Sequence, residues 1–317
     1  MSQVVRIGTR ASKLALAQSG MMQRRIAAAL GAADRPDEAA PLVHITTTGD
    51  RIQDRRLLEV GGKALFTKEI EEALLDGRID AAVHSMKDVP AELPPGLVIA
   101  AIPEREDVRD AFLARACGSL DELPQGASLG TASLRRQAQA LHRRPDLRIV
   151  MLRGNVDTRL AKLAAGEADA ILLAASGLNR LGLGHLPNAL IDPIEAPPAP
   201  GQGALAIQTR AEDADAAWLT ALRHEPTLLT VAAERGALYA LEGSCRTAIG
   251  AHARLEGRTL SLVVEALTPD GARRFRREGQ VELPAEAAEG AARALGLRLG
   301  AEVRELGGPA LLLKVDP

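Results

Sequence analysis

Gly77-Arg-Ile-Asp-Ala81 recurs later in the chain as Gly166-Glu-Ala-Asp-Ala170. Each copy follows an amphipathic run with helical spacing and precedes an apolar run typical of a strand. Each helical run in turn follows a glycine, Gly62 or Gly154. The repetition predicts two α/β lobes of similar plan, and chance similarity of so short a motif is the alternative.

Around the first copy, strand patterns alternate with helical patterns, which is the rhythm of an α/β fold. Gly77 has the conformational freedom to end the helix before it. The expected elements are a strand at Val4–Gly8, a helix from Ser12 to Leu30, a surface loop at Gly31–Pro41, and a strand at Leu42–Thr48, then a helix at Ala64–Asp76 and a strand at Ile79–His84.

Pro94-Pro95 and the stretch Ile102–Asp107 mark an expected first domain boundary, and the proline-rich stretch Ala196–Gly203 marks a second. The chain changes character after the second of them. Strand patterns there are separated by turn residues, and a long helical pattern follows, so we expect a small α+β domain. Its expected strands are Ala248–Leu255, Thr259–Leu267, Ala272–Val281 and a last one near Leu311–Val315, with a helix at Ala285–Leu306.

Composition excludes some classes of function. The chain has 317 residues, enough for two or three domains, and its net charge is −2 with only 2% aromatic residues. A nucleic-acid binder is usually basic and often stacks bases on aromatic rings, so this class is not expected. No apolar run approaches the ~18 residues of a membrane span, and the first residues hold no signal-peptide core. We therefore expect a cytoplasmic protein.

Basic residues stand in several loops, most of them where a strand pattern passes into a helix pattern. Arg and Lys at a helix N-terminus are unfavourable, because their positive charge opposes the helix dipole. The arrangement becomes favourable if an anion binds to the free backbone N–H groups and to the basic side chains together. A solvated charge is the alternative for each loop taken singly. Their recurrence predicts a concave site for a polyanion. The stretch Gly62-Lys63-Ala64 lacks the other residues of a P-loop, so no phosphate-binding motif is recognised. The loops are Gly8–Ser12, Gly61–Lys63, His84–Asp88, Ser133–Arg136 and Leu152–Asn155.

Cys245 lies in the Gly-containing stretch Leu241–Gly250, next to Arg246. The only other cysteine, Cys117, is distant in sequence, and no CxxC pair exists to bind zinc or form a dithiol. A neighbouring cation favours the thiolate, which attacks carbon electrophiles. An incidental cysteine is the alternative.

Asp88 follows Lys87 in one of the basic loops. A turn aspartate is one interpretation. The functional interpretation is a single anion in a cationic cleft, suited to stabilising a cationic intermediate. No second ligand stands at metal spacing from His84, so no metal site is predicted.

Together and in order, these loops resemble the porphobilinogen deaminase family, also called hydroxymethylbilane synthases, of tetrapyrrole biosynthesis. The similarity covers nearly the whole chain, and the His-Ser-Met-Lys-Asp loop and the cysteine loop are its most specific parts. The matching segments are Ile7–Ser12, Val60–Phe66, Ala82–Pro90, Gly130–Gln137, Leu152–Arg159, Gly177–Gly182, Pro200–Gly203 and the Cys245 loop.

The resemblance implies an α/β fold with two lobes like those of periplasmic binding proteins and a small C-terminal α+β domain. It places residues 1–103 with 203–220 in lobe 1, residues 104–202 in lobe 2, and residues 221–317 in the domain that carries the cysteine. The return of the chain to lobe 1 is not visible in the local sequence pattern.

The resemblance also implies a transferase. Cys245 would hold a dipyrromethane cofactor through a thioether, and the free α-carbon of the cofactor would start the chain. Four molecules of porphobilinogen would each lose ammonia and add head to tail, and water would then release hydroxymethylbilane. Asp88 would stabilise the positive charge of each intermediate. The product would pass to uroporphyrinogen-III synthase, and a monomer is expected.

Each pyrrole carries an acetate and a propionate, which accounts for the basic loops. The stretch Gly61–Phe66 is implied as a lid. Glu59, Ser244 and Asp157 depart from the pattern of the family without removing a residue that the chemistry needs. The implied substrate- and cofactor-binding residues are Arg10, Ser12, Lys63, Phe66, Ser85, Lys87, Thr131, Ser133, Arg135, Arg136, Arg153, Asn155, Arg159, Arg180 and Gln202.

Two other functions remain open at this point. A two-lobe protein that binds a small anion without catalysis would explain the repeat and the basic loops, but not a third domain with Cys245. An Arg-rich nucleic-acid binder built around Leu134–Arg144 would need binding with a steep salt dependence.

Overall fold

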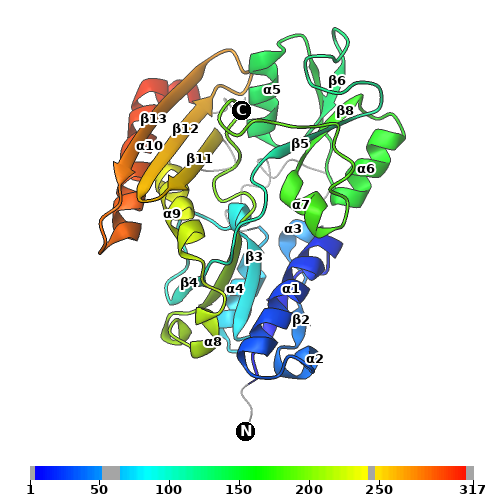
Figure 1. The fold of residues 1–317 in the computed structure, drawn as a ribbon. Helices are drawn as coiled ribbons and strands as arrows, with labels where there is room; N and C mark the ends of the chain where they lie inside the picture. Colours follow the sequence, from blue (N-terminus) through cyan, green and yellow to red (C-terminus); the bar gives the residue numbers. More distant parts are fainter. Residues whose placement is uncertain (1–3, 52–64, 242–246, 312–317) are drawn as a thin grey trace. The chain divides into compact units, whose positions relative to one another are not determined.

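The computed structural model describes residues 4–51, 65–241 and 247–311. The chain divides into two compact units, Met1–Glu106 with Gly203–Leu228, and Asp107–Gln202 with Leu229–Pro317. The segment Gly203–Leu228 therefore lies in the unit of the N-terminus. The first unit holds one sheet and the second holds two (Figure 1). The division into three domains stays a prediction.

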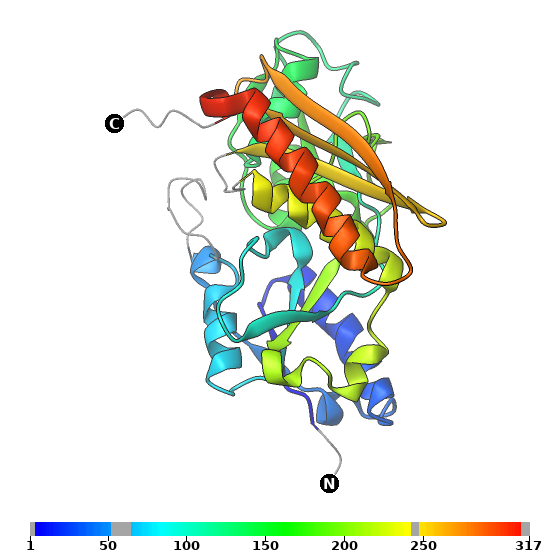
Figure 2. The ribbon, with the colours of Figure 1, turned by 90° about the vertical axis from the view of Figure 1, so that its left-hand side faces the viewer.

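The sheet of the first unit has the strand order β2-β1-β3-β10-β4. Strands β1, β2 and β3 are parallel, and β10 runs antiparallel to both of its neighbours. Helix α1 covers one face and α4 the other (Figure 2). The elements are β1 (Ile7–Thr9), α1 (Lys13–Ala29), α2 (Pro36–Ala39), β2 (Leu42–His44), α3 (Thr48–Arg51), α4 (Lys68–Leu75), β3 (Ala81–Ser85), η1 (Met86–Asp88), β4 (Leu97–Ala101), β10 (Leu205–Arg210), η2 (Ala211–Asp213) and α8 (Ala217–Thr220).

The first sheet of the second unit has the order β7-β6-β8-β5-β9. Its pairings repeat those of the first unit: β6 is parallel to β7 and β8, and β5 is antiparallel to β8 and β9. The prediction of two α/β lobes of similar plan is thereby confirmed. The elements are β5 (Asp110–Ala114), β6 (Ser128–Gly130), α5 (Leu134–Arg143), β7 (Arg148–Val150), α6 (Val156–Ala164), β8 (Ala170–Ala174), α7 (Ala175–Arg180) and β9 (Ala189–Leu190).

The repeated motif has the same structural role in both lobes. Gly77 follows α4 and Gly166 follows α6, with φ angles of 67° and 80°. A side chain on either residue would be strained in this left-handed conformation. The N–H of Gly77 donates to the carbonyl of Leu74 at 3.1 Å, and that of Gly166 to the carbonyl of Leu163 at 3.0 Å. Each glycine therefore ends a helix and turns the chain into a strand.

The aspartates of the motif also match. Asp80 Oδ2 accepts the backbone N–H of Arg6 at 2.9 Å, and Asp169 Oδ2 accepts that of Ser128 at 2.8 Å. The backbone N–H groups of the two aspartates donate in return to the carbonyls of Arg6 and Ser128. In both lobes the carboxylate thus fixes where the neighbouring parallel strand begins.

The small C-terminal domain is α+β, as predicted. Its three strands form an antiparallel sheet in the order β11-β12-β13, and α9 and α10 pack on one face of it around a core of Leu, Val, Ile and Ala (Figure 2). The elements are α9 (Glu225–Ala240), β11 (Ala248–Glu256), β12 (Thr259–Leu267), β13 (Arg274–Glu282), α10 (Ala288–Gly307) and η3 (Gly308–Leu311).

Several expected boundaries need correction. The strand expected over Leu42–Thr48 ends at His44, because Thr48 already begins α3. The loop expected over Gly31–Pro41 contains α2, which is held by the buried side chains of Ala39 and Ala32. Leu311, placed in a final strand, ends a 3-10 turn, and residues 312–315 of that strand lie outside the described residues.

Helix α5 joins lobe 2 to the C-terminal sheet within the second unit. Leu134 and Ala138 of this helix pack against Ala248 and Leu267 of the sheet. Polar contacts extend the junction, because the Gln137 side chain donates to the carbonyl of Pro269 at 3.1 Å. The helix therefore contacts both sheets of its unit.

Candidate functional site

The predicted residues of lobe 1 lie at one edge of its sheet. Strands β1 and β3 are parallel neighbours, so the residues that follow them lie at the same edge. Arg10 and Ser12 follow β1, while Ser85 ends β3 and leads into Lys87. Gln18 of α1 donates from Nε2 to Ser85 Oγ at 3.0 Å, which ties the two strand ends together.

Asp88 is the exposed member of this edge. It closes the short 3-10 turn η1, which is anchored by Met86, whose side chain is only 1% exposed. No residue within the described ranges forms an ion pair or hydrogen bond with the Asp88 carboxylate. The turn thus presents this carboxylate to solvent from a fixed backbone position.

Arg10 lies between a carboxylate and an aromatic ring. Its Nε donates to Asp50 Oδ1 at 3.0 Å, and its guanidinium lies 4.3 Å from the centre of the Phe66 ring. Burial would raise the pKa of the Asp50 carboxyl, but hydrogen bonds from Arg10 and Thr47 outweigh it and lower that pKa. Arg10 and Phe66 are therefore oriented by neighbours within lobe 1, and both stay partly exposed.

His84 lies beneath this edge, in β3. It is 6% exposed, and its Nε2 is 3.0 Å from Gln208 Oε1 on β10. Burial, together with the nearby charge of Arg10, lowers the pKa of His84 to about 4, although the hydrogen bond that His84 donates to Gln208 Oε1 opposes this shift. His84 is thus a neutral core residue at pH 7, in line with its interpretation as a strand residue.

The predicted residues of lobe 2 lie at the equivalent edge of its sheet, after β6, β7 and β8. Two of them are N-caps: Ser133 Oγ accepts the N–H of Arg136 at 3.4 Å, and Asn155 Oδ1 accepts that of Thr158 at 2.9 Å. In lobe 1, Ser12 caps α1 in the same way. These side chains shape the helix N-termini at which anions bind most readily.

Thr131, Arg153, Arg159 and Arg180 complete the edge. Thr131 is buried and its Oγ1 accepts the N–H of Ser133 at 3.1 Å, while the three arginines are half-buried. Arg159 Nε donates to the carbonyl of Gly154 at 2.9 Å. The edge therefore carries several cations besides the pair at the start of α5.

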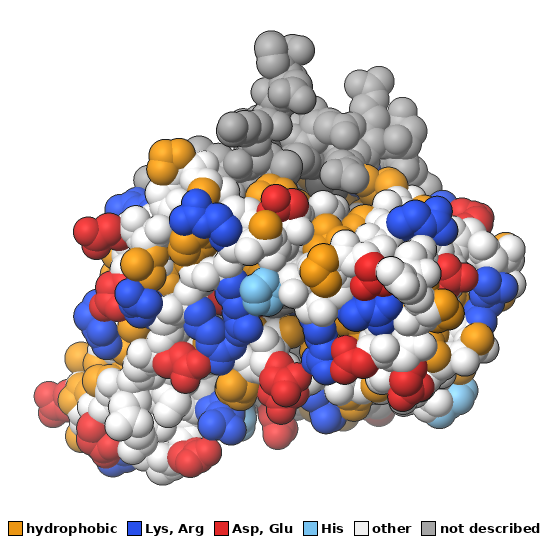
Figure 3. All heavy atoms as spheres, turned by 90° about the horizontal axis from the view of Figure 1, so that it is seen from above, with side chains coloured by type: hydrophobic (Ala, Val, Ile, Leu, Met, Phe, Trp, Pro, Cys, Tyr) orange, Lys and Arg blue, Asp and Glu red, His pale blue; other side chains and the backbone are white. Residues whose placement is uncertain are grey.

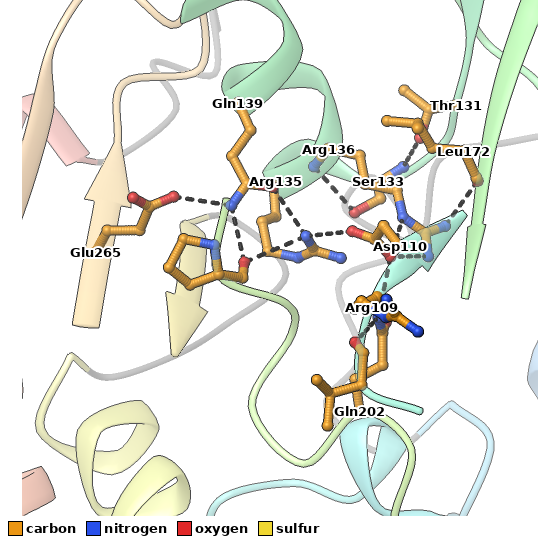
Figure 4. A network of polar contacts seen from close by, with 12 residues as sticks. Arg109, Asp110, Thr131, Ser133, Arg135, Arg136, Gln139, Leu172, Gln202 and Glu265 are labelled. Carbon is orange, nitrogen blue, oxygen red and sulfur yellow. Dashed lines mark hydrogen bonds and ion pairs between the residues drawn. The ribbon is translucent and has the colours of Figure 1, made fainter. Parts of the chain in front are cut away.

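Arg135 and Arg136 are held by one buried carboxylate, Asp110 (Figure 4). Arg135 Nη1 donates to Oδ2 at 2.7 Å, and Arg136 Nη2 donates to Oδ1 at 2.7 Å. All three side chains are 4–7% exposed. Burial would raise the pKa of Asp110, but the charges and hydrogen bonds of both arginines outweigh it and hold that pKa far below its usual range.

A second set of contacts links Arg135 to the C-terminal sheet. Arg135 Nη1 donates to Gln139 Oε1 at 2.8 Å, and Gln139 Nε2 donates to Glu265 Oε1 on β12, also at 2.8 Å (Figure 4). Glu265 is buried, and its other oxygen accepts from Arg274 at 2.8 Å. The C-terminal domain therefore helps to orient a predicted binding residue of lobe 2.

Gln202 is fully buried and contacts the same carboxylate. Its Nε2 donates to Asp110 Oδ1 at 3.0 Å and to the carbonyl of Val108 at 2.7 Å. The preceding residue is held as well, since the N–H of Gly201 donates to the buried Glu234 of α9 at 2.7 Å. The Pro-Gly-Gln-Gly stretch is thus fixed from two sides.

A pocket of about 600 Å³ lies beside this network, between α5 and strands β12 and β13. Its three arginines are all paired: Arg143 with Asp121 and Glu195, Arg274 with Glu265, and Arg276 with Glu278. Basic and acidic side chains are likewise interspersed over the face shown in Figure 3. None of the described residues that the sequence assigns to binding lines this pocket.

Cys245 and Lys63 lie outside the described residues. Sequence reasoning missed Asp110, Asp50 and Glu265, the carboxylates that orient predicted cations. The only sequence feature that could have pointed to one of them was a charged residue at the start of an apolar strand, as in Asp110–Ala114.

Among the residues that the structure covers, no cluster could hold a metal ion and no helix has the length and apolarity to cross a membrane.

Comparisons with known proteins agree over almost the entire chain. The family model "Porphobilinogen deaminase, dipyromethane cofactor binding domain" matches residues 5–217, and "Porphobilinogen deaminase, C-terminal domain" matches residues 228–305. A protein of Caulobacter sp. strain K31 named porphobilinogen deaminase is 71% identical over 98% of both chains. Proteins of the same name from Caulobacter vibrioides and Phenylobacterium zucineum are 70% identical over 98% of both chains.

The solved structures that match part of the chain include periplasmic binding proteins. The methionine-binding protein MetQ has a TM-score of 0.44 at 16% identity, over 69% of this chain and 89% of its own. A periplasmic substrate-binding protein of an ABC transporter from Coxiella burnetii has a TM-score of 0.42 at 16% identity, over 73% and 97%.

Proposed function

The chain belongs to the porphobilinogen deaminase family, and from this premise we propose which of its residues perform the stepwise condensation of porphobilinogen. The enzyme is a transferase of tetrapyrrole biosynthesis with a dipyrromethane cofactor. Four molecules of porphobilinogen are joined head to tail, each with loss of ammonia, and hydroxymethylbilane is released by water.

The donor groups of lobe 2 fit an acidic bipyrrole. Among the described residues, none accepts a hydrogen bond from Nε or Nη2 of Arg135, and we propose that these two donors bind a carboxylate of the cofactor. Cys245 would hold the cofactor, which when bound supplies the pyrrole α-carbon as the nucleophile. Ser133, Arg136, Arg153, Arg159 and Arg180 would bind its acetate and propionate groups, since guanidinium matches carboxylate in shape and charge.

Asp88 carries the catalytic part of the proposal. An exposed carboxylate without a described partner stands on a fixed turn, at the sheet edge that also bears Arg10 and Lys87. Such a group can stabilise the cation that forms when porphobilinogen loses ammonia, and can accept a proton from a pyrrole N–H. Arg10 and Lys87 at the same edge, together with Lys63, which the family resemblance implies, would bind the carboxylates of the substrate.

We propose that the enzyme works in the cytoplasm as a monomer and passes its product to uroporphyrinogen-III synthase. The net charge of −2 and the pairing of surface cations support a small-molecule substrate rather than nucleic acid.

Intact mass spectrometry of the denatured protein tests the proposal. The wild-type protein should exceed its sequence mass by two porphobilinogens less two ammonias, and Cys245→Ser should lack this excess. Cys117→Ser is the matched control, because it removes the other cysteine and should retain the added mass. An unmodified wild-type protein that also fails to release ammonia from porphobilinogen would exclude the function.

A further inference from the structure

We propose that Asp110 is a positioning residue that makes Arg135 and Arg136 act as one carboxylate-binding unit. The inference rests on the proposed function and assigns a role to a buried residue that would not itself touch substrate or cofactor. Three observations carry it: the geometry of the two arginines, the charge they leave, and the way Asp110 is held.

The geometry requires a bridging group. Adjacent residues on an α-helix point about 100° apart, so Arg135 and Arg136 would diverge if left alone. Asp110 binds each arginine through a different oxygen, with Oδ2 to Arg135 and Oδ1 to Arg136. Arg136 Nη1 also donates to the carbonyl of Leu172 at 2.9 Å. These bonds bring both guanidiniums to the same side of α5.

Charge explains why the bridge is a carboxylate. Two guanidiniums and one carboxylate, all nearly dry, leave one net positive charge at the sheet edge. Solvent screens that charge far less than it screens the charge of a surface arginine. The charge therefore attracts a carboxylate of the ligand more strongly. Without Asp110, two like charges would be buried together, which is strongly unfavourable.

Asp110 is itself held in place. Gln202 donates to its Oδ1 at 3.0 Å and to the carbonyl of Val108, two residues before Asp110. Asp110 also begins β5 and pairs with Ala174 of β8, so its backbone is part of the sheet. The carboxylate can therefore serve as a fixed reference for two flexible side chains.

The decisive variant is Asp110→Asn, which keeps the size and one acceptor but removes the charge. Protein free of cofactor, prepared from cells unable to make porphobilinogen, is incubated with porphobilinogen, and the fraction carrying the added mass is followed in time. We expect incorporation to slow and KM to rise, each roughly 10- to 100-fold, because misplaced binding groups have effects of this size. Incorporation should raise the melting temperature of the wild type, because the bound group interacts with the folded state only, and this rise should be smaller in Asp110→Asn.

Asp121→Asn is the matched control. Asp121 also pairs with an arginine of α5, Arg143, but both side chains are about half exposed, and neither is among the described hydrogen-bond partners of the Asp110 carboxylate, which are Arg135, Arg136 and Gln202. Incorporation and KM should stay at wild-type values. A folded Asp110→Asn protein with wild-type incorporation and KM would overturn the proposal.

Two further variants separate positioning from a general loss of stability. If Asp110 acts through the arginines, Asp110→Asn should slow incorporation much less in an Arg136→Gln background than in the wild type; full additivity would contradict the proposal.

If Asp110→Asn fails to fold, Gln202→Leu provides the test, since it removes a hydrogen bond to the Asp110 carboxylate without changing charge. Unchanged incorporation in Gln202→Leu would then refute the role. A wild type that never gains pyrrole mass would instead refute the proposed function.

Discussion

Asp88 and Asp110 are both carboxylates among cations, yet their surroundings suit them to opposite tasks. Asp110 is buried and saturated with donors, so it can only hold its neighbours. Asp88 is exposed on a turn and has no pairing group among the described residues, so it is free to interact with a cationic intermediate. Residue type alone does not separate these two roles.

Replacing Asp88 by Asn should lower kcat by about 100- to 1,000-fold, the range for losing an electrostatic group that acts in the transition state. The fold should persist, because the side chain is exposed. Steady-state kinetics with circular dichroism checks both expectations. Asp76→Asn, another exposed aspartate of lobe 1, should leave kcat unchanged. Wild-type turnover in Asp88→Asn would move the cation-stabilising role elsewhere.

The burial of the neutral His84 side chain predicts that the folded protein loses stability in acid. The unfolded chain protonates this residue near its usual pKa of 6.5, whereas the folded protein does so only near 4. The neutral side chain therefore contributes fully above pH 6.5, and its contribution is lost as the pH falls from there to about 4. Between pH 7 and 5, melting temperatures should fall more steeply for the wild type than for His84→Gln. Parallel falls would contradict the burial of an uncharged imidazole.

At the level of elements, α5 combines several tasks in ten residues. Its N-cap and first turn hold the candidate binding arginines, and Gln139 reaches the C-terminal sheet. His142 Nδ1, near its end, lies 2.8 Å from the carbonyl of Gly271. Because α5 contacts both sheets of the second unit, it fixes the position of one sheet relative to the other.

Gln139→Ala should destabilise the second unit by about 1–3 kcal/mol, because the buried Glu265 and the carbonyl of Pro197 each lose a donor. The melting temperature measures the loss. Gln137→Ala is the control: its single bond to the carbonyl of Pro269 leaves no buried charge short of a partner, so the effect should be smaller. Equal losses would mean that Gln139 does not support Glu265.

At the scale of the whole molecule, lobe 2 and the C-terminal domain belong to one compact unit. Gly271 lies at their junction with a φ of 72°, and a Cβ there would lie 2.5 Å from the backbone N of His142. The turn between β12 and β13 therefore contacts helix α5 through backbone as well as side chains, and a change at this point should reach both α5 and β12.

Gly271→Ala should lower hydrogen-exchange protection in α5 and in β12 together, while α1 in the other unit keeps its protection. Gly257→Ala is matched to it, since Gly257 also has a positive φ of 60°, but a Cβ there meets nothing within 4 Å. The control should disturb only the hairpin of β11 and β12. Loss of protection confined to β12 in Gly271→Ala would show that the junction does not couple the sheets.

Much of the fold could be predicted from local patterns. Ser12 and Ser133 are placed at helix starts, and Gly77 and Gly166 at helix ends, because capping depends on residues close in sequence. The strand Leu42–Thr48 was overextended because β-branched residues favour strands even where the chain turns into α3. The roles of Asp110 and Gln202 were beyond such reasoning, because their partners are far away in the chain.

Local patterns in the amino-acid sequence were enough to predict the two-lobe plan, the family, and the candidate residues Asp88, Cys245 and the arginines, because motifs and periodicity are local and ordered along the chain. The folded structure was needed to find which cations are already paired, which carboxylate is buried, and that α5 joins two sheets. Those properties depend on burial and on contacts between distant segments, such as Asp110 with Arg135 and Gln139 with Glu265. Solvent exclusion gives these contacts their strength, and it exists only once the chain has folded.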